Sequence, residues 1–172
     1  PPRLLFHLAE PLQSYVGEAE GLSGSLTLPD ADSSQQRPLE GAQGTVIVST
    51  RTVTMGEADL DEAVASSLIL HASRFPEARF VVKEVEAQDP IAWGHVTPAQ
   101  FSGTFTMRGV SAPLVVTVEL EPTLDEVGQP AIFARGWFTL RLAKPFGIVA
   151  LDEPQPAADT LLFDVTLRLI PA

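Results

Sequence analysis

The stretch FSGTFTMRGVSAPLVVTVEL, residues 101–120, decides the fold of this chain. Apolar and polar side chains alternate in it, first over 101–107 and again over 114–120. A period of two with one polar face is typical of a half-buried antiparallel strand. Gly109 suits a tight turn between two such strands, and Pro113 suits the entry of the second one. The stretch therefore predicts two antiparallel strands joined by a short turn.

The same alternation recurs along the chain. In residues 78–82 the apolar face is Ala78, Phe80 and Val82, although Val81 and Val85 blur the pattern. Counted together, the alternating runs predict about nine strands, which points to an antiparallel sheet closed into a barrel or packed as a sandwich. Besides those above, the clear runs are 22–28 and 161–169, and the weaker runs are 4–8, 13–18, 45–53 and 132–142.

One segment departs from this period and predicts a helix over about 59–71. Asp59 is expected to cap its start, three residues before Glu62, and Leu60, Val64 and Leu68 then fall on one face. The remaining connections have the composition of loops and turns. They are a long polar loop over 29–44, a hairpin over 125–130 and a Pro-rich loop over 151–159.

Composition limits the classes of protein that fit. The 172 residues suit one domain, and the absence of cysteine excludes disulfides, thiolate metal sites and cysteine nucleophiles. A net charge of −11 opposes nucleic-acid binding. No stretch reaches the ~20 consecutive apolar residues of a membrane-spanning helix. Residues 1–4 lack the pattern of a secretory signal, so they give no indication of the compartment.

No combination of residues in the sequence indicates catalysis or a bound metal. His7, His71 and His95 fall in three different elements without metal-ligand spacing. Nucleophile motifs and phosphate-binding loops are missing, and the carboxylates lie mostly in loops or at the helix start. Arg135 and Arg141 are unusual in an apolar strand, and an outward orientation explains both. We therefore expect no catalytic residue, no metal and no cofactor.

The predicted inward faces are almost purely apolar. An eight-stranded barrel has the size at which the interior either fills with side chains or holds one small ligand. The aromatic residues fit both cases, as packing in a filled core or as the lining of an apolar pocket. From periodicity alone, both interiors remain open.

Three segments resemble the YceI-like family of lipocalin-like barrels. The strongest is residues 101–118, which is similar to that family's strand–turn–strand element. The segment SRFPEARF, residues 73–80, resembles the part that follows the family's helix. Residues 133–141, FARGWFTLR, followed by FGI at 146–148, resemble a third motif. Together the three segments cover the chain from about 59 to 170 in the family's order.

The resemblance implies one domain over 1–172, an all-β, antiparallel, eight-stranded lipocalin/streptavidin-like barrel with one short helix. It further implies a soluble, non-enzymatic carrier or store that holds a polyisoprenoid or fatty-acyl chain inside and is exported to the periplasm or secreted. Arg108, Trp137 and Arg141 are candidates for the rim. The expected lining is Phe80, Phe101, Phe105, Met107, Leu114, Val116, Val118, Ile132, Phe138, Phe163 and Val165.

Two other functions remain as alternatives. One is a packed β-barrel interaction module of a stress response, without a ligand. The other is a hydrolase or isomerase for an apolar substrate, which would need buried polar groups that the inward faces hardly offer. The expected partner is a lipid ligand. We expect neither nucleic-acid binding nor a membrane span, and a homodimer is possible.

Overall fold

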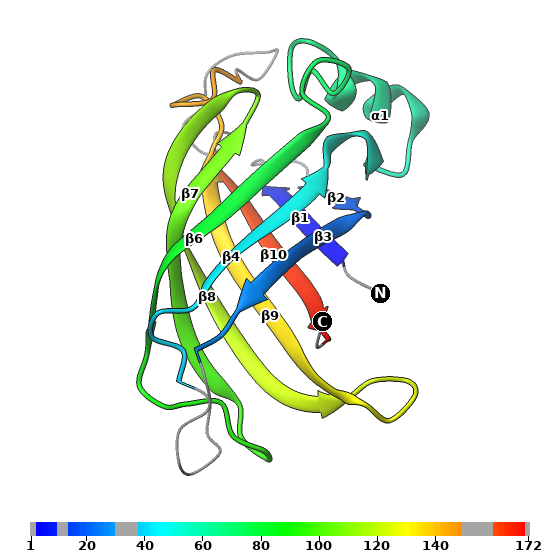
Figure 1. Cartoon of the computed structure of the whole chain (residues 1–172). Coiled ribbons are helices and arrows are strands. Elements are labelled where there is room, and N and C mark those ends of the chain that lie inside the picture. Colours follow the sequence, from blue (N-terminus) through cyan, green and yellow to red (C-terminus); the bar gives the residue numbers. More distant parts are fainter. Residues whose placement is uncertain (1–2, 10–13, 30–37, 149–159, 171–172) are drawn as a thin grey trace.

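The computed structural model describes residues 3–9, 14–29, 38–148 and 160–170. They form one antiparallel sheet of ten strands that curls around an interior, with a short helix at one end (Figure 1). The strand order is β3-β4-β6-β7-β8-β9-β10-β1-β2-β5. The strands are β1 (Arg3–Ala9), β2 (Ser14–Ala19), β3 (Leu22–Thr27), β4 (Gln43–Ser49), β5 (Val53–Thr54), β6 (Glu77–Ala87), β7 (Thr97–Met107), β8 (Val110–Leu124), β9 (Pro130–Arg141) and β10 (Thr160–Leu169).

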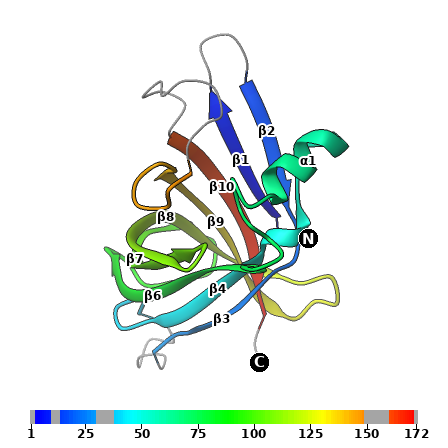
Figure 2. The same ribbon diagram turned by 90° about the horizontal axis from the view of Figure 1, so that it is seen from above.

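The all-β barrel is confirmed, but the expected count of eight strands is wrong. β2 and β3 are separated only by Glu20 and Gly21, and β4 and β5 only by the 3-10 helix η1 (Thr50–Thr52). β2 pairs with β5 while β3 pairs with β4, so each couple behaves as one long strand with a bend. Ten segments thus trace 10 − 2 = 8 positions around the barrel, viewed from above in Figure 2.

The predicted hairpin is formed by β7 and β8. Met107 lies opposite Val110, and Arg108 and Gly109 form the turn with φ of 54° and 74°. Glycine adopts this left-handed region without steric cost, whereas Arg108 must be held there by its surroundings. A Cβ on Gly109 would also lie 3.1 Å from Cε1 of Phe75, so the turn packs closely against the segment before β6.

The irregular alternation around Val85 has a local cause. The pairing of β6 with β7 shifts between Val82 and Glu84, as at a β-bulge. Ala78 and Val82 are buried before the shift and Val85 after it, three residues on instead of two. The bulge therefore returns Val85 to the interior, and Val81 remains exposed.

Helix α1 (Ala58–Ala65) is shorter than the predicted helix, which extended to residue 71. Its N-cap residue is Glu57, not Asp59. Ser66 ends the helix, because its backbone is extended and its hydroxyl donates to the Ala63 carbonyl at 2.7 Å. His71 then takes a φ of 50°, which a helix does not allow.

Asp61 of α1 connects the helix to the end of β5 through hydrogen bonds. Its carboxylate accepts hydrogen bonds from the hydroxyl of Thr54 at 2.8 Å and from the backbone N–H of Met55. α1 has no buried residue, so its position depends on such contacts more than on packing.

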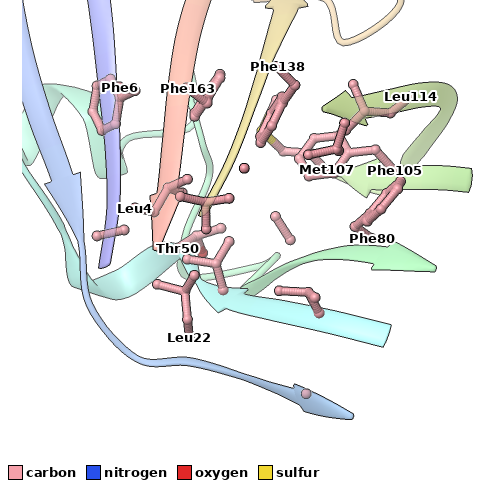
Figure 3. Close-up of a pocket in the computed structure, with 18 of the residues that line it drawn as sticks. Leu4, Phe6, Leu22, Thr50, Phe80, Phe105, Met107, Leu114, Phe138 and Phe163 are labelled. Carbon is pink, nitrogen blue, oxygen red and sulfur yellow. The ribbon is translucent and has the colours of Figure 1, made fainter. Parts of the chain in front are cut away.

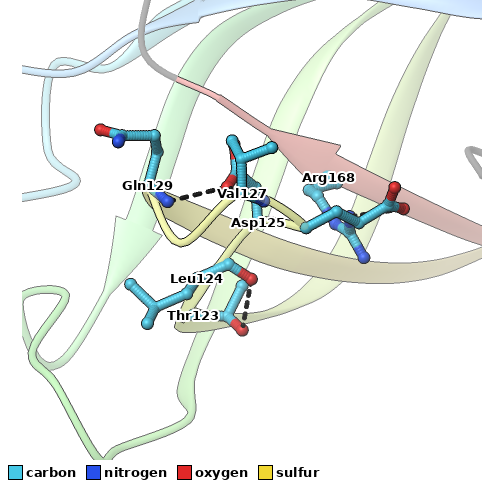
Figure 4. A network of polar contacts seen from close by, with 7 residues as sticks. Thr123, Leu124, Asp125, Val127, Gln129 and Arg168 are labelled. Carbon is cyan, nitrogen blue, oxygen red and sulfur yellow. Dashed lines mark hydrogen bonds and ion pairs between the residues drawn. The ribbon is translucent and has the colours of Figure 1, made fainter.

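The predicted hairpin over 125–130 joins β8 to β9. The Asp125 carboxylate accepts from the backbone N–H groups of Val127 at 2.9 Å and Gln129 at 2.8 Å (Figure 4). Beside this turn, Arg168 of β10 forms an ion pair with Glu126 at 3.4 Å. The predicted loop over 151–159 and residues 30–37 of the predicted loop over 29–44 lie outside the described residues, and β4 already begins at Gln43.

Within the part of the chain that the structure describes, no helix is both long and apolar enough to cross a membrane.

Candidate ligand cavity

The curled sheet encloses a cavity of about 890 Å³ (Figure 3). Its wall is built by the strand faces that alternation marks as apolar. From β8, the four alternating residues Leu114, Val116, Val118 and Leu120 line the cavity. From β10, the five alternating residues Leu161, Phe163, Val165, Leu167 and Leu169 line it as well. The interior is therefore hollow, which does not fit the packed interaction module.

Ten of the eleven expected lining residues lie on the cavity wall: Phe80, Phe101, Phe105, Met107, Leu114, Val116, Val118, Phe138, Phe163 and Val165. The exception is Ile132, which packs against the buried core instead. Ile132 lies near the start of β9, opposite Pro122, toward the end of the barrel that side chains fill.

One end of the barrel is closed by packing. Leu39, Thr97 and Leu120 are each 2% exposed or less, and Ala42 and Ile91 are buried beside them in the same core. Leu120 belongs to both this closed end and the cavity wall. Leu120 therefore lies where the packed core meets the cavity wall.

The wall carries rows of side chains of different size. Phe6, Phe163 and Phe138 lie opposite one another on neighbouring strands. The rings of Phe163 and Phe138 stack at 4.7 Å between centroids, and Phe6 follows at 5.9 Å from Phe163. Phe105 extends this aromatic row at 6.4 Å from Phe138. The cavity therefore has an aromatic band with residues from four strands: β1, β10, β9 and, beyond β8, β7.

The next row toward the closed end is small. It contains Gly136, flanked by Val165 and Val118 on the neighbouring strands. A Cβ on Gly136 would lie 3.0 Å from Cγ1 of Val165 and 3.2 Å from Cγ1 of Val116. The free space in this part of the cavity thus depends on the absence of a side chain at residue 136. The sequence patterns did not indicate Gly136 as a lining residue.

The opposite end, called here the helix end, consists of α1 and residues 66–75. Arg108 fastens it to the barrel, donating to the carbonyl oxygens of Leu68 at 3.1 Å and Ser67 at 3.2 Å. Residues of the helix end also line the cavity. The sequence did not predict this, because a helix and turns lack period-two alternation. The residues of this region that line the cavity are Leu60, Ala63, Val64, Ile69 and Leu70, with Met55 beside them.

None of the three proposed rim residues lines the cavity. Arg108 contacts the turns after α1, and the other two are Trp137 and Arg141. These two alternate with Gly136 and Phe138 and so lie on the outer face of β9. Arg135 shares that face, where it pairs with Asp164 at 2.7 Å. The hydrogen bond and charge of Asp164 raise the pKa of Arg135.

Polar groups are few on the wall. Thr50 is 3% exposed and lines the cavity, with its hydroxyl donating to the Phe75 carbonyl at 2.6 Å. Arg168 is the one charged residue among the described residues that line the cavity. In the same described residues, no three His, Asp or Glu side chains come together as metal ligands would. The geometry suits an apolar molecule with at most one polar end.

Comparisons with known structures support the same architecture. BcnA from Burkholderia cenocepacia matches with a TM-score of 0.73 at 13% identity, over 98% of this chain and 96% of that one. The YCEI protein of Campylobacter jejuni gives 0.70 at 15% identity, over 91% and 84%. A polyisoprenoid binding domain from Saccharophagus degradans, implicated in plant cell wall breakdown, gives 0.69 at 12% identity, over 99% and 94%. At these identities the likeness establishes the fold.

No curated protein sequence matches the chain significantly. A family model described as the YceI-like domain, however, matches residues 5–167, which is nearly the whole sequence. The chain therefore belongs to the YceI-like family.

Proposed function

We propose that this protein binds one long apolar lipid, a polyisoprenoid or fatty-acyl chain, inside its barrel and acts as a carrier or store. The observation that carries the proposal is the apolar cavity of about 890 Å³. That volume lies near the upper end of the ~300–1,000 Å³ typical of small-molecule sites. Burial contributes about 0.8 kcal/mol per methylene, whereas association costs on the order of 4–15 kcal/mol, so a long chain is favoured over a short one.

Family membership supports this ligand class. The Saccharophagus neighbour is described as a polyisoprenoid binding domain, and this chain has the same fold around an apolar interior. The proposal includes no reaction, because a hydrolase or isomerase needs acidic or basic groups at its substrate. Export to the periplasm or secretion is part of the proposal, as is one functional unit over 1–172. Fractionation of cells that express the natural gene tests the location.

Native mass spectrometry of protein purified without detergent tests the ligand. We expect a stoichiometric adduct of several hundred daltons, which solvent extraction releases with a polyprenyl or acyl fragmentation pattern. The same spectrum gives the number of subunits. A bare mass that persists after incubation with isoprenoid quinones and fatty amides contradicts the proposal and favours an interaction module without a ligand.

A further inference from the structure

The one strongly buried polar side chain on the described cavity wall belongs to Thr50. It lies in η1, directly after β4, and lines the cavity together with Leu4 and Leu22 (Figure 3). The other polar side chains that line the cavity, Ser23, Ser25, Thr45 and Arg168, are at least partly exposed. A ligand buried in the cavity therefore meets Thr50 as its principal polar partner.

Thr50 is restricted to one hydrogen-bonding role. A threonine hydroxyl has one proton and two lone pairs. The proton is committed to the Phe75 carbonyl at 2.6 Å, while the backbone N–H of Thr50 donates to the Pro76 carbonyl at 2.9 Å. What remains for a ligand is the two lone pairs of Oγ1, which accept hydrogen bonds and cannot donate one. Their complement is a ligand group that carries an O–H or N–H.

Among the described residues that line the cavity, no cation lies beside Thr50. The neighbouring Arg51 is exposed and donates to the Ala72 carbonyl, and the guanidinium of Arg74 is exposed and lies over the Phe75 ring. Arg168 lies near the far end of β10 and pairs with Glu126. Burying a carboxylate or phosphate without a partner charge is costly, so anionic head groups are disfavoured beside Thr50.

The position of Thr50 also gives the direction of the ligand. Ser49, next to it, pairs with Glu77 at the start of β6, whereas Ala87 at the end of β6 pairs with Ala99 beside the closed end. Thr50 thus lies at the helix end of the barrel. A head group at Thr50 leaves the tail to extend past the aromatic band and Gly136 toward Leu120.

Resting on the proposed function, we propose that Thr50 selects lipids whose uncharged polar end donates a hydrogen bond, such as long-chain alcohols, over matched esters and carboxylates. Three C16 ligands distinguish these groups: 1-hexadecanol, methyl palmitate and palmitate. Each is titrated against the full chain loaded with diphenylhexatriene, an apolar fluorescent dye, and displacement is measured.

In the wild-type protein we expect hexadecanol to bind about three- to tenfold more tightly than methyl palmitate, the value of one neutral hydrogen bond, and palmitate to bind more weakly than hexadecanol. Thr50→Val should abolish the preference for the alcohol, and Thr50→Ser should retain it. The dye affinity of each variant reports whether its cavity is intact.

Equal binding of the alcohol and the ester, tightest binding of palmitate, or a preference that survives in Thr50→Val would each overturn the assignment. Failure of the dye and all three lipids to bind would instead overturn the proposed function. If Thr50→Val does not fold, the methyl NMR signal of Thr50 in the wild-type protein decides: the alcohol should shift it more than the ester, and equal shifts would refute the role of Thr50.

Discussion

The strand wall and the helix end enclose the same cavity but are held in place differently. In the wall, from β6 through β10, each strand is paired with its neighbours through long ladders, such as the ten residue pairs from Thr160↔Arg141 to Leu169↔Ile132. At the helix end, α1 has no buried residue and is fixed by Asp61, while Arg108 fastens the following turns. The wall thus fixes the shape of the cavity, whereas its cover lacks strand pairing and is held by a few polar contacts and by the packing of Ile69 and Leu70 against the core.

The largest expected effect of a single substitution is on the closed end of the wall. Leu120→Ala removes a side chain that is 1% exposed and should lower the free energy of unfolding by about 2–5 kcal/mol. Urea denaturation measures it. The matched control Leu124→Ala, on the same strand but 55% exposed, should change stability by less than about 0.5 kcal/mol. Equal losses in both variants would contradict a packed closed end.

A second variant tests the aromatic band. Truncating Phe105 and Phe138 together to alanine removes two rings that line the cavity and should weaken lipid binding by roughly tenfold or more, since each buried ring contributes on the order of 1.5–3 kcal/mol. Phe133→Ala, on the outer face of β9, serves as the control. Unchanged ligand retention in the double variant would refute the assignment of these residues to the ligand.

Gly136→Leu sharpens the comparison within the wall. The new side chain starts between Val165 and Val116 and must project into the cavity, so it should shorten the space available to a chain. Displacement titrations with C10 and C18 alcohols should show a loss of about tenfold for the longer chain and less for the shorter one, at ~0.8 kcal/mol per displaced methylene. Thr139→Leu places the same side chain on the outer face as a control. An equal loss for both lengths would argue against passage over Gly136.

The smallest effect is expected at the helix end. Arg108→Ala removes two hydrogen bonds to the turns after α1. Because both bonds are exposed, we expect each to contribute only about 0.5 kcal/mol, the low end of the usual range. We expect faster release of a bound lipid in stopped-flow dye exchange, with little change in the urea midpoint. Arg141→Ala, on the outer face, controls for the lost charge. A release rate equal to that of the wild type would show that Arg108 does not hold the cover.

The same contrast explains how far the sequence predicts the structure. Period-two alternation is a local rule, so eight of the nine predicted runs lie in single strands, and ten of eleven proposed residues lie on the cavity wall. The ninth run, 45–53, is interrupted by η1 between β4 and β5. That the proposed residues contact a lipid remains a prediction. The contribution of Ile69 depends on contacts between distant segments, which no spacing encodes. The end of α1 at Ser66 and the role of Asp61 depend on local hydrogen bonds of single polar side chains, which an apolar period does not register. Gly136 was missed because a lining position without a side chain carries no apolar signal.

The two bends between β2 and β3 and between β4 and β5 have a mechanical consequence. Gly21, with a φ of 71°, and η1 lie side by side, where the hydroxyl of Thr52 donates to the Glu20 carbonyl. Beyond them, among the described residues, β3 pairs only with β4, and five consecutive residues of β3 border the cavity. β3 and β4 therefore form a two-stranded part of the wall that is paired to the rest of the sheet through β6. A wider ligand can push β3 outward without breaking any strand ladder.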